Sequence, residues 1–96
     1  MLINLSSIRD DRTLEVSKVG DALTINGDTF DFSQLPDGAT LPNEAIGCEF
    51  ILSDVHRVNG EIELTILLPH GANASESARF PTPITMTTNG QVVLPI

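Results

Sequence analysis

The chain has 96 residues and a formal net charge of −8, from thirteen acidic and five basic side chains. A chain of this length builds one core, so we expect a single domain over residues 1–96. Phosphate backbones and anionic lipid surfaces would repel such a charge, which argues against nucleic-acid and membrane binding. Four Phe with no Trp or Tyr are too few for the aromatic platforms typical of carbohydrate or single-stranded nucleic-acid sites.

Residues 13–33 contain apolar alternation interrupted by two turn-forming dipeptides. Gly reaches the positive φ angles of two-residue hairpin loops at the lowest cost. With Gly20-Asp21 as a loop, Val16 lies opposite Ile25, and the apolar side chains share one face. The segment is therefore predicted to form a three-stranded meander.

The second turn of this meander has two alternative registers. Gly27-Asp28 as the loop sets Ile25 opposite Phe30, whereas Asn26-Gly27 as the loop leaves Ile25 facing Asp28. Apolar cross-strand pairs each contribute roughly 0.2–1 kcal/mol, and the first register makes more of them. We therefore predict Gly27-Asp28 as the loop.

A stiff loop is predicted over residues 34–44, because Pro36 and Pro42 interrupt any ladder. Asn59-Gly60 then predicts a second hairpin, whose later strand alternates polar residues with Ile62, Leu64 and Ile66.

The matching strand of this second hairpin spans about residues 49–58. Its register sets Val55 opposite Leu64 and Ile51 opposite Leu68, with His56 facing Glu63 on the wetter side. Leu52 and Val58 break the alternation, which predicts partial cover on both faces or a bulge.

The C-terminal third has weaker patterns. Residues 69–78 lack periodicity and are predicted to be a surface loop or one short helical turn. Asn89-Gly90 predicts a final hairpin between residues 84–88 and 91–96. Three prolines flank this hairpin and belong at strand edges or ends, because proline lacks the ladder donor: Pro81, Pro83 and Pro95.

These elements predict an all-β fold. The sum is an antiparallel β-sandwich or flattened barrel of seven to eight short strands built from consecutive hairpins. No helix of useful length and no internal repeat is predicted.

His56, His70 and Cys48 are the only soft metal ligands in the sequence. None stands at the two-to-four-residue spacing typical of zinc sites, so no zinc site is predicted. Cys48 has no cysteine partner for an intrachain disulfide, and its apolar neighbours favour a buried small side chain over a reactive thiol.

Three carboxylates, Asp28, Asp31 and Asp37, are candidate oxygen ligands, but they lack the alternating spacing of a calcium loop. Asp28 is interpreted as a turn residue and Asp31 as an outward-facing strand residue. No serine stands in a nucleophile-elbow context, and Glu61 and Glu63 project to one solvated face. We therefore predict no catalytic residue, no metal and no cofactor, and expect a non-enzymatic protein.

Two loops, residues 35–42 and 68–74, are the segments least explained by strand chemistry. Loops on a rigid β scaffold often serve recognition, and they also simply connect strands; the sequence leaves both readings open. The N-terminal residues lack a basic region followed by an apolar run, and no segment is long and apolar enough to span a membrane, so we expect a cytoplasmic location.

Residues 23–32 (LTINGDTFDF), 35–42 (LPDGATLP) and 67–73 (LLPHGAN), with the opening MLINLS, carry a resemblance over most of the chain. The chain resembles short uncharacterised proteins from the tail-gene regions of tailed phages and prophages of Gram-negative bacteria. The resemblance implies a structural or tail-assembly protein made in the bacterial cytoplasm, with the virion as a second location. It supplies no site residues.

The main functional hypothesis is a non-enzymatic domain that serves phage tail structure or assembly through protein–protein contacts. It would bury an apolar patch or add an exposed strand edge to another sheet, and self-association would protect such edges. The alternative is a small-ligand or metal-binding module that uses carboxylates or imidazoles, namely Asp28, Asp31, His56 or His70.

Overall fold

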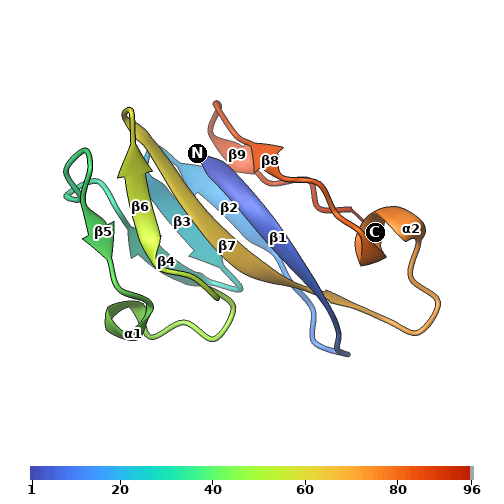
Figure 1. Cartoon of the computed structure of the whole chain (residues 1–96). Helices are drawn as coiled ribbons and strands as arrows, with labels where there is room; N and C mark the ends of the chain where they lie inside the picture. The colour runs from blue at the N-terminus through green and yellow to red at the C-terminus, as the bar shows by residue number, and fades with distance from the viewer. Residues whose placement is uncertain (96) are drawn as a thin grey trace.

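Two β-sheets form the protein, and the all-β prediction is confirmed (Figure 1). The computed structural model describes residues 1–95, which contain nine strands, one more than the upper prediction. In chain order the strands are β1 (Leu2–Arg9), β2 (Val16–Val19), β3 (Ala22–Ile25), β4 (Asp28–Asp31), β5 (Thr40–Leu41), β6 (Val55–Val58), β7 (Glu61–His70), β8 (Ile84–Thr85) and β9 (Gly90–Gln91). One sheet has the order β5-β6-β7-β1-β8 and the other β4-β3-β2-β9. The sheets do not close on one another, so the fold is a sandwich and not a barrel.

Two four-residue helical turns lie in the connections. The first, α1 (Asn43–Ile46), ends at Gly47, whose φ of 70° is left-handed and suits glycine. The second, α2 (Glu76–Arg79), begins at Ser75, whose hydroxyl accepts a bond from the Ala78 N–H. Of residues 69–78, predicted as a surface loop or one short helical turn, the first two belong to β7 and the last three to α2.

The first hairpin has the predicted register. Val16 lies opposite Ile25 and Lys18 opposite Leu23 across the Gly20-Asp21 turn. Val16, Leu23 and Ile25 are almost completely buried, so one face of this hairpin contributes directly to the core.

The predicted second register is wrong. Ile25 lies opposite Asp28, because Asn26-Gly27 and not Gly27-Asp28 forms the loop. Both loop residues have positive φ, 49° and 89°, which is the type I′ turn that Asn-Gly favours most. The Asn26 amide also accepts from the Glu15 N–H at 2.8 Å and donates to the Thr13 carbonyl at 3.0 Å. Turn geometry and these bonds together outweigh the extra apolar pair.

The second hairpin is confirmed at its turn and wrong further along. His56 faces Glu63 across Asn59-Gly60, as predicted. Ile51, however, bridges to Ile66 rather than to Leu68. The Leu52 N–H still donates to the Thr65 carbonyl at 2.9 Å, but residues 53 and 54 leave the ladder. The Ser53 hydroxyl accepts the Thr65 N–H at 2.9 Å in place of a strand partner. This irregularity is the bulge-like alternative and shifts the register by two residues.

Two further expectations are corrected. The predicted loop of residues 34–44 contains β5, which pairs with β6 at Thr40 opposite His56, and part of α1. The predicted final hairpin does not form: β8 pairs with β1 and β9 pairs with β2, so the chain crosses between the sheets over residues 86–89. The last residue of that predicted hairpin, Ile96, lies outside the described residues.

The longest strand pairing was not predicted. β1 runs parallel to β7 through eight residue pairs, so the fold is not built only from consecutive hairpins. Ile3 lies beside Leu64 and Leu5 beside Ile66, which continues the buried face of β7 onto β1. Figure 1 shows β1 and β7 side by side across the front sheet.

The core lies between the two sheets. Its largest side chains with almost no exposure come from both sheets and from the bridge at Ile51: Ile3, Val16, Leu23, Ile25, Ile51, Val55, Ile62, Leu64 and Ile66. Their burial supplies the main driving force for folding, at roughly 1.5–3 kcal/mol for each large apolar side chain.

Arg57 joins the two sheets. It lies opposite Ile62 on the face of β6 that is turned toward the core, and its side chain is only 12% exposed. The guanidinium donates to the Asp21 carboxylate at 2.9 Å and to the Phe32 carbonyl at 3.1 Å, both in or next to the other sheet. It also donates to the carbonyls of Leu35 and Gly60. Four acceptors therefore satisfy one buried cation.

Replacing Ile3 with Ala tests the parallel pairing. Because Ile3 is fully buried beside Leu64, we expect I3A to lower the free energy of unfolding by about 2–5 kcal/mol in urea denaturation followed by circular dichroism. The control N4A removes a half-buried side chain on the other face and should cost no more than ~0.5 kcal/mol. Equal losses in the two variants would contradict the strand placement.

Arg57→Met keeps an apolar stem and removes the guanidinium. We expect a loss of about 2–4 kcal/mol in unfolding free energy, because charged hydrogen bonds to four acceptors disappear. Arg57→Lys should recover only part of this, since an ammonium lacks the planar fork that reaches several acceptors at once. The more exposed Arg12→Met serves as the control and should cost no more than ~1 kcal/mol. A fully stable R57M would contradict this role.

Candidate functional site

The soft metal ligands lie in separate parts of the fold. The Nδ1 atom of His56 is 2.9 Å from the Thr40 hydroxyl, and that of His70 is 3.0 Å from the Gly71 carbonyl. Cys48 is half-buried in the connection between α1 and β6. Within residues 1–95 no three His, Cys, Asp or Glu side chains gather closely enough to hold a metal ion.

The three aspartates considered as calcium ligands also diverge. Asp28 and Asp31 are three positions apart on β4, so they project from opposite faces of the strand. The Asp31 carboxylate accepts the Ser33 N–H at 2.9 Å, which lowers the pKa of Asp31, and Asp37 accepts the Gly60 N–H at 2.8 Å. Asp31 thus stabilises the chain just after β4, whereas Asp37 joins its loop to the turn of the second hairpin.

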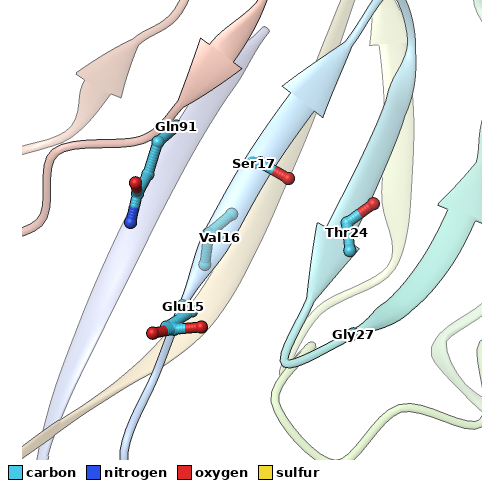
Figure 2. A pocket seen from close by; sticks show the side chains of 6 residues that line it. All are labelled: Glu15, Val16, Ser17, Thr24, Gly27 and Gln91. Carbon is cyan, nitrogen blue, oxygen red and sulfur yellow. The ribbon is translucent and has the colours of Figure 1, made fainter.

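One hollow lies on the outer face of the four-stranded sheet (Figure 2). Its volume is about 380 Å³, and its lining residues are Glu15, Val16, Ser17, Thr24, Gly27 and Gln91. Ser17 lies opposite Thr24, and the Gln91 side chain approaches from the neighbouring strand. Glu15 is the one lining residue whose side chain could act as a general base. The Thr24 hydroxyl is instead 2.8 Å from the Thr29 hydroxyl, so the lining shows no activated nucleophile.

The sheet edges differ in how well they are protected. β5, β8 and β9 are two residues long, Pro42 directly follows β5 and Pro83 directly precedes β8. β1 continues beyond its short partner β8, but the segment alongside has two prolines, and the Ser7 hydroxyl donates to the Ala78 carbonyl there. Among the edges in residues 1–95, β4 alone has four residues and no proline. It is therefore the edge best able to pair with another strand.

The free backbone groups of β4 can be assigned from the hairpin. The residues that flank a two-residue loop exchange hydrogen bonds, so Asp28 and Phe30 bond inward to β3. Every second residue bonds inward in this way, and the Phe32 N–H accordingly donates to the Asp21 carbonyl at 3.0 Å. Thr29 and Asp31 consequently direct their N–H and C=O groups away from β3, toward the open side.

A hollow of about 290 Å³ adjoins this edge. Two segments line it, the β3–β4 hairpin and the connection after α1, through Ile25, Asn26, Asp28, Phe30, Gly47, Cys48, Glu49 and Phe50. Asp28 and Phe30 face it because they share the face of Leu23 and Ile25 that is turned toward the core. The hollow thus extends the buried face of the sheet sideways beyond β4.

Arg12 contacts two residues that line the hollow, the aromatic Phe50 and the acidic Glu49. Arg12 places its guanidinium carbon 4.8 Å from the centre of the Phe50 ring and bonds the Glu49 carboxylate at 3.0 Å. Asp10 accepts from the same guanidinium at 2.7 Å, and this contact lowers the pKa of Asp10. Within residues 1–95 Asp28 takes part in no ion pair, so its carboxylate stays available at the rim of the hollow.

Comparison of the chain with protein-family models, with curated proteins and with solved structures gives no match. Neither described helix is long and apolar enough to cross a membrane.

Sequence reasoning missed most of this site. It treated Asp28 as a turn residue and did not connect it with Glu49 and Phe50, which stand about twenty positions later. A short strand flanked by aspartates was the one available signal, because charged residues often mark an edge strand. Residues 35–42, considered for recognition, are bound to the second hairpin through Asp37 and β5.

The lowered pKa values of Asp10 and Asp31 predict how the free energy of unfolding changes in acid. Their native pKa values lie below the unfolded value of about 3.9, so their contribution is fully present above that pH and disappears as pH falls through the native values. We expect the urea midpoint of D10N/D31N to fall less steeply than wild type below pH ~4. Parallel curves for the two proteins would contradict this assignment.

Proposed function

We propose that the protein is a non-enzymatic β-sandwich that binds another protein by accepting an extended segment at the edge of β4. One observation supports this above the others: β4 is a four-residue edge without proline, whose Thr29 and Asp31 backbone groups point away from β3. An added strand would use these groups for main-chain hydrogen bonds, and its side chains would provide specificity.

The distribution of reactive side chains favours a binding role over catalysis. His56 and His70 are bonded to neighbouring groups on different segments, and in the hydroxyl-lined hollow the Thr24 hydroxyl bonds Thr29 rather than the Glu15 carboxylate. No observation favours the alternative metal-binding module, because its four residues lie on separate faces or elements.

We further propose that this binding serves phage tail assembly, and this role rests on the sequence resemblance alone. A heterologous partner is favoured over a second copy at this edge. Two β4 strands side by side would bring Asp28 and Asp31 of both copies close together, and like charges across a strand pair are destabilising.

Thr29→Pro tests the edge directly. The substitution removes one outward N–H and no ladder bond, so the fold should persist while affinity for a tail protein encoded by a neighbouring gene falls about tenfold. Thr29→Val is the matched control: it loses the same hydroxyl contact with Thr24 but keeps the N–H. Isothermal titration calorimetry provides the affinities, and circular dichroism checks the fold.

Equal affinities of T29P and T29V would contradict strand addition at β4. Failure of every neighbouring gene product to bind would contradict the tail-assembly role.

A further inference from the structure

We infer that the segment accepted at β4 is basic, and that one arginine or lysine side chain of it occupies the hollow between Asp28 and Phe50. This inference depends on the proposed strand addition and specifies the chemistry of the partner.

The geometry of a sheet leads an added strand to this hollow. Side chains of neighbouring strands line up across a sheet, so every second residue of the added strand would face the same way as Asp28 and Phe30. Those two side chains line the hollow, whose far wall is formed by Gly47, Cys48 and Phe50. An inward-facing side chain of the added strand would therefore be directed toward the hollow.

The walls suit a long side chain with a cationic end. Half-buried Phe30, with the small exposed part of Phe50, offers apolar surface to an aliphatic stem. Asp28 at the rim offers a carboxylate that no cation within residues 1–95 occupies. Arginine and lysine bury such stems while their charged ends stay near water or a carboxylate.

The protein already holds one arginine in this manner. Arg12 combines a contact of 4.8 Å to the centre of the Phe50 ring with an ion pair of 3.0 Å to Glu49. Arg12 does not line the hollow, so its contact leaves the hollow open for a second cation. The same pair of features, an aromatic ring and a carboxylate, recurs there as Phe50 and Asp28.

Other occupants fit less well. An apolar side chain would fill the walls but would cover the Asp28 carboxylate without pairing it, which costs desolvation. An acidic segment, or a second copy of a chain with a net charge of −8, would meet repulsion.

The test uses synthetic strand peptides. The probe is the capped peptide Thr-Val-Thr-Arg-Thr-Val-Thr, about as long as a typical strand. Its comparison peptides replace the arginine with citrulline, which has nearly the same shape without charge, or with leucine or glutamate. Titrations are followed by ¹⁵N NMR shifts of the protein. We expect the arginine peptide to bind about five- to tenfold more tightly than the citrulline peptide, with shifts centred on β4 and residues 47–50.

Two matched variants locate the charge. Asp28→Asn should weaken the arginine peptide about five- to tenfold and leave the citrulline peptide unchanged. Asp31→Asn changes the net charge equally on the same strand but on the opposite face, and should weaken the arginine peptide less than about twofold. Binding should also slow alkylation of Cys48, the one cysteine, which lines the hollow.

Several results would overturn the inference. Equal losses in D28N and D31N would mean that only the overall charge matters. Leucine or citrulline binding as tightly as arginine would mean that the hollow does not select a cation. In either case, weaker binding of every peptide to T29P but not to T29V would support strand addition at β4 and contradict only the basic partner. If no peptide shifts β4 and T29P binds tail proteins as tightly as T29V, the proposed function itself fails.

Discussion

The relative position of the two sheets depends on hydrogen bonds donated by the Arg57 guanidinium. The side chain leaves β6 on the core side and donates to Asp21, in the turn between β2 and β3, and to the carbonyl of Phe32, which directly follows β4. A cation inside a sandwich is tolerated only when its donors find acceptors, so these segments must keep fixed relative positions. Phe32 directly follows β4, and the position of β4 against the rest of the molecule is thereby restricted.

The edge of β4 acquires its chemistry from the turn that precedes it. With Asn26-Gly27 as the loop, Asp28 is the first strand residue and lies opposite Ile25, so its carboxylate reaches the rim of the hollow. With Gly27-Asp28 as the loop, the same carboxylate would stand at the tip of the turn. The preference of Asn-Gly for positive φ at both positions therefore decides which side chain a partner would meet.

Local signals predicted the local parts of this fold. The register of β2 with β3 and the Asn59-Gly60 turn follow from alternation and from turn residues, and both are confirmed. The pairing of β1 with β7 joins segments about sixty positions apart, and tertiary packing of Ile3 beside Leu64 selects it. The two-residue strands are too short for any pattern. The candidate site depends on Phe50 returning to the side of Asp28, which no spacing along the chain encodes.

The acidic composition has two consequences at an open edge. Carboxylates on Asp28 and Asp31 disfavour pairing between copies, which is a common way to keep an edge strand from aggregating. The same charge attracts a basic segment from a distance and raises its association rate, but this long-range attraction is screened at physiological salt and does not distinguish one basic segment from another. Selectivity must therefore come from contacts made after encounter. Under the proposed strand addition, the mixed lining of the hollow would supply such contacts, because Phe30 and Asp28 would meet a side chain from only one position of the added strand.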